Sequence, residues 1–430
     1  MKVLPHSFSD SIPVSRRNFL ATAAGLGALS LVAPEELFAQ IEGVNLAANY
    51  RIVPVGTRQK PVVIFWLEGG ASHIDTFNTL PDAPVEYRGP HGSIQTSVPG
   101  LRISEHLPLM ARQMHRVALL KNVHHTQGDH RLATNRMFTG SDDERSSVPV
   151  HTPFTVRLKK HLEGTNVAPY VAFKSDGVYL WPALGSSEAL TVDRNADAAT
   201  SPTMPYRSPF GQGFDVARHN GRTGLLGQLN RTSSLSGPQV ERWDTLTERA
   251  NAALRGDLSR AFDLTSVPQV QRDRYGNTNL GNSALVARRL VAAGAPFIVI
   301  NNLGWDHHGQ IGNELRTRLP ELDKATSSIT QDLGNNAVVV IASEFGRTPL
   351  VNGSAGRDHW PRSNFMVISG IGQKVIGALD NTGNITGKDG SFNAALMGPT
   401  ILRAAGYEIV EERSGVLTTN KMPYYQPLFD

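Results

Sequence analysis

The feature that most constrains the fold is a series of short apolar segments that alternate with helical patterns. KPVVIFWL at 60–67 carries a continuous apolar run between Pro61 and Gly69, which is typical of a strand buried on both faces. Further strands are expected at 116–123, 169–174, 296–302, 336–343 and 364–369. Helices are expected at 105–115, 282–294, 314–333 and 393–406. Since such alternation builds parallel sheets, the sequence predicts an α/β fold with a doubly wound, mostly parallel sheet.

The alternation stops between about residues 175 and 281, where Ser, Arg, Asn and Gly are frequent. One amphipathic helix is expected there, at 239–258, but no strand pattern in this stretch could build a second sheet. We therefore interpret 175–281 as an irregular, partly helical insertion in a single domain that spans 60–430. Residues 41–59 are expected to form a linker before that domain.

The N-terminus carries the pattern of an export signal. Arg16 and Arg17 stand just before Phe19 and a weakly hydrophobic, Ala- and Gly-rich stretch that ends near Ala33. This pattern predicts a twin-arginine signal peptide over 1–40, use of the twin-arginine export machinery, and a periplasmic or secreted protein. The alternative is a short amphipathic helix with two incidental arginines. The apolar stretch is shorter than the ~20 residues that span a bilayer, so no stable transmembrane segment is expected in the mature chain.

Charge and cysteine content exclude several classes of function. The 42 basic and 38 acidic residues give a formal charge of +4, and the basic residues form no run or stripe. No nucleic-acid partner is therefore expected. The chain has no cysteine, which excludes disulfides, thiolate zinc sites and thiol nucleophiles. A metal would have to be held by His, Asp, Glu or carbonyl oxygen.

Four polar clusters follow predicted strands at their carboxyl ends. They are LEGGASHID after 60–67, VHHTQGDH after 116–123, LGWDHH after 296–302, and SEFGRTP after 336–343. In an open parallel sheet, ligands bind in the crevice beyond those ends. The four loops are therefore predicted to meet at one functional site.

The first and third of these loops offer a hydroxyl and a pair of metal-type side chains. Gly69 and Gly70 permit a tight turn that would place Ser72 near a helix N-terminus, where it could act as a nucleophile or only as a cap. Asp306 and His308 are two residues apart, so in an extended loop both can ligate one cation.

The fourth loop and the segment after it add charged and imidazole groups. Glu344 could be a metal ligand or a base, and Arg347 could clamp anionic oxygens, although such a pair is also common as a local salt bridge. Asp358 and His359 could be two ligands, or one ligand and the group that orients it.

The second loop leaves more alternatives open. Its three histidines, His124, His125 and His130, could be ligands, helix caps or hydrogen-bonding groups for neighbouring loops.

The segments WLEGGASHIDTF, GWDHHG, EFGRTP and GRDHWP, in this order, resemble the domain-of-unknown-function family 1501 over about residues 60–425. Its members are typically exported bacterial proteins with a distant similarity to the alkaline phosphatase and sulfatase superfamily. The resemblance implies an alkaline-phosphatase-like fold, with divalent metals at strand ends and transfer of phosphoryl or sulfuryl groups. By position in the motifs, the resemblance implies that Ser72 is the nucleophile. It also implies that Asp306, His308 and His359 bind one metal and that Glu344 binds a second. Glu68 would stand where the superfamily usually has an aspartate ligand.

Two departures from the superfamily pattern modify this expectation. Its strand-end Asp-His pair is here Glu344-Phe345, so one imidazole expected at the second metal is absent. Glu344 and Asp358 would then complete a second site or orient the imidazoles. The chain also lacks a Cys or Ser in the frame C/S-x-P-x-R, which disfavours a formylglycine sulfatase mechanism.

These patterns favour an exported hydrolase that acts on an anionic phosphate ester, or a related sulfate ester, in a small molecule or a polymer. It would depend on a divalent metal, which could be zinc, calcium, magnesium or manganese. The alternative is a non-catalytic exported protein that keeps the fold and uses the crevice for binding or surface assembly.

Overall fold

The computed structural model describes residues 50–140, 171–173, 190–192, 260–386, 391–413, 416–421 and 423–430. All of them belong to one compact unit. The predicted signal peptide at 1–40 and the predicted helix at 239–258 lie outside the described residues. In the described part of the chain, no helix combines the length and the apolar character needed to cross a membrane.

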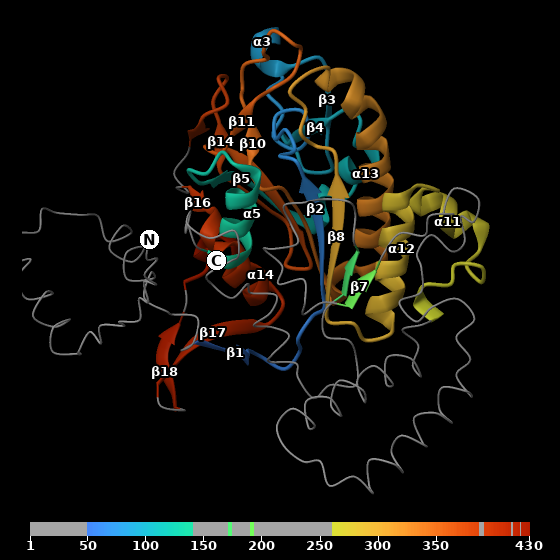
Figure 1. Ribbon diagram of the computed structural model, residues 1–430, viewed down its shortest axis with the longest axis vertical. Helices are drawn as coiled ribbons and strands as arrows, with labels where there is room; N and C mark the ends of the chain where they lie inside the picture. Colours follow the sequence, from blue (N-terminus) through green and yellow to red (C-terminus); the bar gives the residue numbers. More distant parts are fainter. Residues whose placement is uncertain are drawn as a thin grey trace, which may run out of the picture. The chain divides into compact units, whose positions relative to one another are not determined.

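The described part is built around a nine-stranded sheet with the order β13-β5-β12-β9-β2-β8-β6-β7, and β16 pairs with β5 (Figure 1). The strands are β2 (Val62–Glu68), β5 (Val117–His124), β6 (Val171–Phe173), β7 (Leu190–Val192), β8 (Phe297–Leu303), β9 (Val338–Ala342), β12 (Asn364–Ser369), β13 (Lys374–Ile376) and β16 (Phe392–Asn393). Only β12 is antiparallel to its neighbours, β5 and β9, and all other pairings are parallel. The predicted α/β class with a mostly parallel sheet is confirmed.

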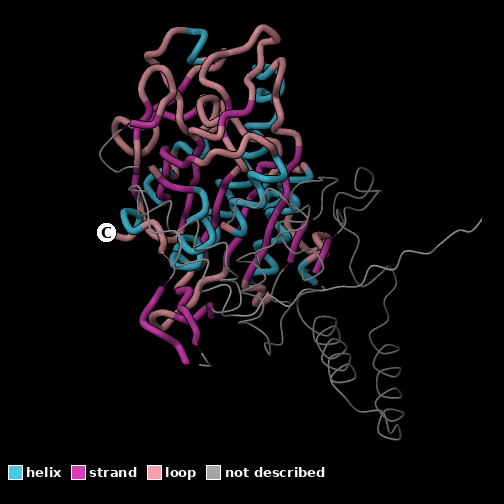
Figure 2. Tube along the Cα trace, turned by 60° about the vertical axis from the view of Figure 1, so that its left-hand side comes forward, coloured by secondary structure: helices cyan, strands magenta, loops and turns pink. Residues whose placement is uncertain are grey.

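Helices cover both faces of this sheet (Figure 1, Figure 2). They are α4 (Pro108–Ala111), α11 (Gln269–Tyr275), α12 (Asn279–Ala292) and α13 (Ile311–Leu333) on one face, and α5 (His130–Thr139) and α14 (Met397–Ala404) on the other. The side chains of β2 alternate between the two cores: Phe65 packs with the α12 and α13 residues, whereas Trp66 packs with those of α5 and α14. Both faces of β2 are thus buried, which explains its uninterrupted apolar sequence.

Shorter elements complete the described chain. They are α3 (Val85–Arg88), β3 (Ser93–Gln95), β4 (Arg102–Ser104), β10 (Gly346–Arg347), β11 (His359–Trp360), β14 (Ala378–Leu379) and β15 (Ile385–Thr386), with 3₁₀ turns at Met114–Arg116, Gly334–Asn336, Ala394–Leu396 and Gln426–Leu428. The helix expected at 105–115 is reduced to α4 and the turn at Met114–Arg116.

A separate three-stranded sheet corrects the linker prediction. Residues 50–54 form β1 (Tyr50–Pro54), which pairs with β17 (Tyr407–Arg413), and β17 pairs with β18 (Val416–Lys421). The expected linker at 41–59 is therefore wrong for this segment, because Ile52 is buried and its backbone is hydrogen-bonded in a ladder.

The described end of the predicted insertion, residues 260–281, also packs closely. Phe262, Leu264 and Tyr275 join the core under α12 and α13. This end of the insertion belongs to the core of the α/β domain.

Candidate metal centre

The loops that follow β5, β8 and β9 meet beyond the carboxyl end of the sheet. Asp306 and His308 follow β8, and the backbone N–H of Trp305 donates to the carbonyl of Glu68 at the end of β2. After β9 the chain forms β10, which pairs with β11 so that Arg347 lies opposite His359. Parallel strands thus bring side chains that are distant in sequence to one edge.

The carboxylate of Asp306 is the point on which three imidazoles converge. Its Oδ2 atom lies 3.3 Å from Nε2 of His130, and its Oδ1 atom lies 3.1 Å from Nε2 of His308 and 3.3 Å from Nε2 of His359. The Nε2 atoms of His308 and His359 are 3.0 Å apart. The convergence expected for Asp306, His308 and His359 is therefore present in the structure.

Each of these imidazoles is also held from behind. Nδ1 of His130 lies 2.8 Å from Oε1 of Glu344. Nδ1 of His308 lies 2.7 Å from Oδ1 of Asp358, and Nδ1 of His359 lies 2.7 Å from the carbonyl oxygen of Gly128. When Nδ1–H donates to such an oxygen, the lone pair of Nε2 faces Asp306. This is how protein imidazoles that bind metals are usually oriented.

The charges at the centre are strongly coupled. Partial burial opposes ionisation of Asp306, but hydrogen bonds from His130, His359 and Arg347 outweigh burial and hold the pKa of this carboxyl well below its usual range. Burial likewise lowers the pKa of His130, but its hydrogen bonds to Asp306 and Glu344 outweigh that effect and raise the pKa to about 9. Without a cation, His130 therefore carries the positive charge between the two carboxylates.

The geometry of the donor atoms fits a small divalent cation. Single ligand atoms from His130, Asp306 and His359 lie within 4.8 Å of one another. Tetrahedral zinc with bonds of about 2.0–2.1 Å to nitrogen needs ligand atoms about 3.3–3.4 Å apart, close to the observed separations from Asp306. His308 supplies a further imidazole beside this group.

Glu344 and Asp358 lie behind the imidazoles. Glu344 is fully buried, and its Oε1 atom also accepts the backbone N–H of Gly69 at 2.7 Å. Asp358 accepts from the side-chain amide of Asn352 at 3.2 Å as well as holding His308. The sequence left open whether these two acids complete a second metal site or orient the imidazoles. Their contacts match the second alternative.

Arg347 was expected to clamp the anionic oxygens of a substrate, but the structure places its side chain in the interior. Its side chain is fully buried, and its guanidinium donates to the backbone carbonyls of Gly69, Gly70 and Arg357 and to Oδ1 of Asp306 at 2.5 Å. Buried carbonyls need hydrogen-bond donors, and the guanidinium satisfies several of them at once. Arg347 therefore fixes the loops and the Asp306 carboxylate and does not face solvent.

Ser72 has the surroundings of a structural hydroxyl. It is fully buried, donates to Oδ2 of Asp75 at 2.5 Å, and accepts the backbone N–H of Asp75 at 3.3 Å. Asp75 is in turn paired with the buried guanidinium of Arg357 at 2.7 Å. The structure does not bring Ser72 into hydrogen-bonding contact with the imidazoles around Asp306. Residues 74–77 form a turn in place of the expected helix, and the Ser72 hydroxyl caps that turn.

Glu68 is also outside the cluster. This buried residue ends β2, and its Oε2 atom accepts the side-chain amide of Asn301 at 2.5 Å. In the described ranges, Glu68 is not among the side chains that could share a cation with Asp306.

Sequence reasoning did not single out His130 as a ligand. Asp129 caps α5 by accepting the N–H of Leu132 at 3.0 Å, which places His130 on the first turn of α5 and over the strand edge. His125, in the same loop, is instead structural: its Nε2 lies 2.6 Å from the carbonyl of Glu344, and burial lowers its pKa to about 4. The position of HHTQGDH after β5 was the available signal, but it did not distinguish these histidines.

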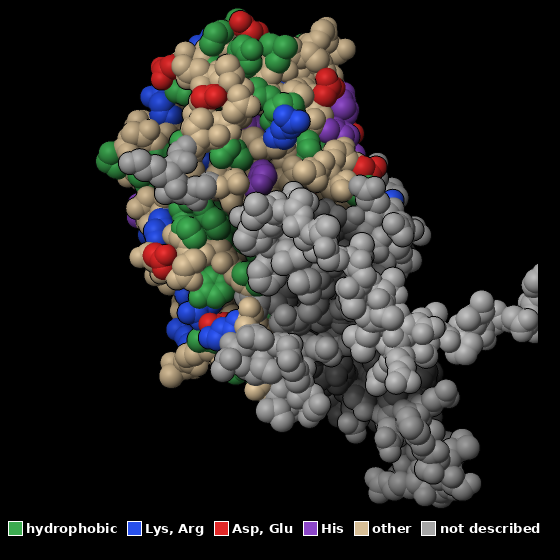
Figure 3. Space-filling view, turned by 90° about the vertical axis from the view of Figure 1, so that its left-hand side faces the viewer, with side chains coloured by type: hydrophobic (Ala, Val, Ile, Leu, Met, Phe, Trp, Pro, Cys, Tyr) green, Lys and Arg blue, Asp and Glu red, His purple; other side chains and the backbone are tan. Residues whose placement is uncertain are grey.

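The centre is accessible from solvent. The side chains of Asp306 and His308 are 45% and 49% exposed, whereas that of His130 is almost fully buried. On the face drawn in Figure 3, some histidine side chains lie beside acidic ones at the upper right edge of the described surface. A ligand can therefore approach Asp306 from solvent. On the buried side, His130 contacts Asp306 and is itself held by Glu344.

Solved structures similar to this chain include the C-terminal periplasmic domain of EcEptC from Escherichia coli in complex with Zn (9% identity, 84% of this chain and 86% of that chain, TM-score 0.38). Another is Ps i-CgsB, with 10% identity over 81% of this chain and 72% of that chain and a TM-score of 0.41. A third is an alkaline phosphatase variant from the Antarctic bacterium TAB5 with Mg bound in the M3 site, with 12% identity over 81% of this chain and 99% of that chain and a TM-score of 0.39. These likenesses concern the fold alone, and at these TM-scores they carry no argument about activity or metal.

Comparison with the curated proteins found no significant match. A family described as "Protein of unknown function (DUF1501)" matches residues 59–409, which is most of the chain. The chain therefore belongs to the DUF1501 family.

Proposed function

We propose that the protein is an exported, metal-dependent hydrolase of phosphate esters or related sulfate esters. Its divalent cation would be held by His130, Asp306 and His359, with His308 beside them, which leaves a position open for water or substrate. The observation that carries this proposal is that three imidazoles turn Nε2 toward one carboxylate while an oxygen holds each Nδ1. An imidazole-rich set of ligands suits zinc better than calcium or magnesium, which prefer oxygen.

The residues around the cation would have distinct tasks. A cation at this centre would supply Lewis acidity to an ester oxygen. Glu344 and Asp358 orient His130 and His308, and Arg347 holds the Asp306 carboxylate in place. The half-exposed side of Asp306 leaves room for an anionic substrate to approach.

We assign the attack on the ester to water and not to Ser72. The Ser72 hydroxyl is buried and already donates to Asp75, whereas a nucleophilic hydroxyl needs a base and access to substrate. Export of the protein rests on the Arg16-Arg17 segment of the sequence.

The second candidate is a non-catalytic exported protein that uses the metal centre for binding or assembly. The observation that favours it is Phe345, whose ring lies 4.9 Å from that of His130 and 4.6 Å from that of His359. An apolar ring therefore takes the place where the superfamily pattern has an imidazole, and Arg347 beside it is committed to backbone carbonyls.

The test is hydrolysis of a panel of phosphate monoesters, phosphodiesters and sulfate esters by untagged protein of known metal content. We expect turnover that is lost in His359→Ala, with the fold retained, and that is unchanged in His115→Ala, an exposed histidine beside Ser97. Turnover that survives in His359→Ala would contradict the proposal. Full metal content without turnover of any ester would favour the binding alternative.

A further inference from the structure

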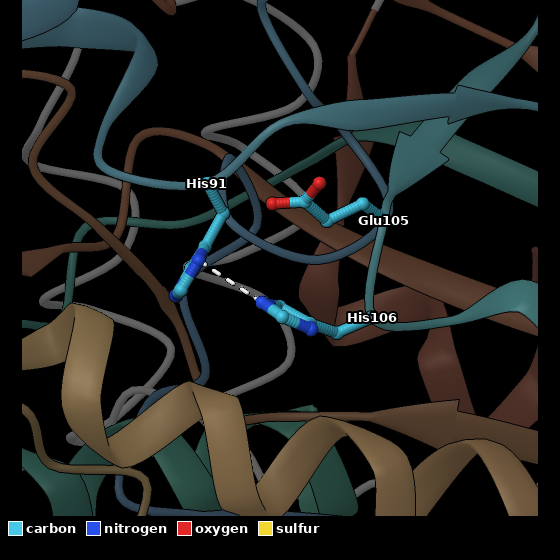
Figure 4. A group of neighbouring side chains, drawn as sticks. All are labelled: His91, Glu105 and His106. Carbon is cyan, nitrogen blue, oxygen red and sulfur yellow. Dashed lines mark hydrogen bonds between the residues drawn. The ribbon is translucent and has the colours of Figure 1, made fainter.

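A second group of metal-type side chains lies outside the centre around Asp306. It consists of His91, Glu105 and His106, and single ligand atoms from the three lie within 4.8 Å of one another. Figure 4 shows the rings of His91 and His106 turned toward each other, with the carboxylate of Glu105 on one side of them. None of these residues takes part in the proposed hydrolysis.

The β3–β4 pair explains why these side chains meet. The strands are antiparallel with Ser93 opposite Ser104, so the residues just beyond, His91 and His106, also come to lie opposite each other. The backbone N–H of Glu105 donates to the carbonyl of Gly92 at 3.1 Å, and Oε1 of Glu105 accepts the N–H of Gly92 at 2.8 Å. Glu105 is thus held at the open end of this ribbon.

The two imidazoles have the orientation of a metal pair. Nε2 of His91 lies 3.0 Å from the carbonyl oxygen of Gly312 at the start of α13, so this nitrogen can donate outward. The lone pair of Nδ1 then faces Nε2 of His106, which is 3.0 Å away. The rings are nearly perpendicular, with centroids 4.5 Å apart. A carbonyl behind one imidazole is the arrangement that orients ligands at metal sites.

We propose that His91, Glu105 and His106 bind a second divalent cation of the zinc class. Two imidazoles and one carboxylate are three protein ligands that leave an open position, a set well suited to zinc. A tetrahedral cation needs the two nitrogens about 3.3–3.4 Å apart, a few tenths of an ångström more than the 3.0 Å observed. The cation would replace the hydrogen bond between the rings.

The side chains of this site are accessible to solvent. A cavity of about 280 Å³ borders His91 and is also lined by Gly92, Ser93, Arg88 and Arg102, so solvent reaches this one ligand from the cavity side. Glu105 is exposed to solvent, and His106 is half-buried. The bound cation would tie the β3–β4 pair to the start of α13 through His91 and Gly312, and so would stabilise the folded chain by linkage.

The test is the number of Zn²⁺ ions bound by the full chain in equilibrium dialysis, with unfolding curves to verify each variant's fold. If both sites bind zinc, the wild type holds two ions and His106→Ala holds one. In the His130→Ala/His359→Ala background, one ion should remain at the His91 site. Adding His106→Ala to this background should weaken the binding of that ion by about 100-fold or more, because loss of an outer-shell partner alone costs about 10–100-fold. His115→Ala serves as the matched histidine control and keeps the wild-type number.

Glu105→Gln provides a second variant that preserves the shape of the ribbon. Its amide oxygen can still accept from Gly92, but it is a weaker ligand than a carboxylate, so we expect weaker Zn²⁺ binding in the same background. The proposal is overturned if His106→Ala binds as many zinc ions as the wild type. It is also overturned if the folded His130→Ala/His359→Ala background binds none. Either result leaves the ester hydrolysis test of the Asp306 centre unaffected.

Discussion

The Nδ1 atom of His130 lies 2.8 Å from the Oε1 atom of Glu344, although 214 residues separate the two in sequence. Glu344 also accepts the N–H of Gly69, so one buried carboxylate joins the end of β9, the turn after β2 and the first turn of α5. This contact fixes the ring of His130 with Nε2 toward Asp306. The same acid that was expected to bind a second metal thus positions His130, a proposed ligand of the first.

Glu344→Gln should weaken cation binding at the Asp306 centre by about 10–100-fold, as loss of an outer-shell carboxylate usually does. The amide is similar in shape to the carboxylate but is a poorer acceptor for the N–H of His130. The measurement is titration calorimetry with Zn²⁺ in the His106→Ala background, where only the Asp306 centre is expected to bind. Glu314→Gln, on the exposed surface of α13, is the control. Equal affinity in both variants would show that Glu344 does not position His130.

Cation binding should strengthen as pH rises from about 6.5 toward 9. The pKa of His130 is raised to about 9 in the metal-free protein, so its imidazolium must lose a proton before Nε2 can bind a cation. Charged His130 stabilises the metal-free fold fully below pH 6.5, and this stabilisation is lost as pH rises through 9. Calorimetry in buffers of different ionisation enthalpy should detect release of about one proton per cation at pH 7. Binding without proton release would disagree with this assignment.

Ser72→Ala should lower the free energy of unfolding by about 1–3 kcal/mol and leave turnover and metal content unchanged. The substitution removes a buried hydroxyl that donates to Asp75 and caps its N–H, and it leaves the carboxylate paired only with Arg357. Denaturant unfolding and ester hydrolysis measure the two effects separately. A folded, fully metallated variant without turnover would instead identify Ser72 as the nucleophile.

Arg347→Lys should destabilise the protein by about 3 kcal/mol or more, because the three donors of a compact ammonium group cannot replace the wide guanidinium, which bonds three backbone carbonyls and the Asp306 carboxylate. The loss of stability should appear in chemical denaturation even without any substrate. Arg362→Lys, outside this network, is the matched control. A variant with wild-type stability but without ester binding would support a clamp that faces substrate.

The main features of the fold could be predicted from the sequence because its strands are buried on both faces. The run at 62–67 is apolar throughout, and it forms β2 in the middle of the sheet. Tyr50–Pro54 gave no such signal, since β1 is short and lies in a small antiparallel sheet whose partner, β17, is far away in sequence. Long-range pairing of this kind leaves no local pattern.

The candidate site could be predicted in part. Asp306, His308 and His359 were expected to meet because they follow strand ends, and they do. The place of Arg347 could not be predicted, since its burial depends on which backbone carbonyls the folded loops leave without donors. His130 could not be distinguished from the other histidines of its loop until α5 was in place.

The metal centre around Asp306 is tested by an anomalous-difference map at the zinc edge, from crystals of the untagged protein grown with Zn²⁺. We expect a peak within about 2.0–2.2 Å of Nε2 of His130, a carboxylate oxygen of Asp306 and Nε2 of His359. Such a peak should be absent from His359→Ala crystals grown under the same conditions. A wild-type map without density between these three side chains would contradict the assignment of a metal centre.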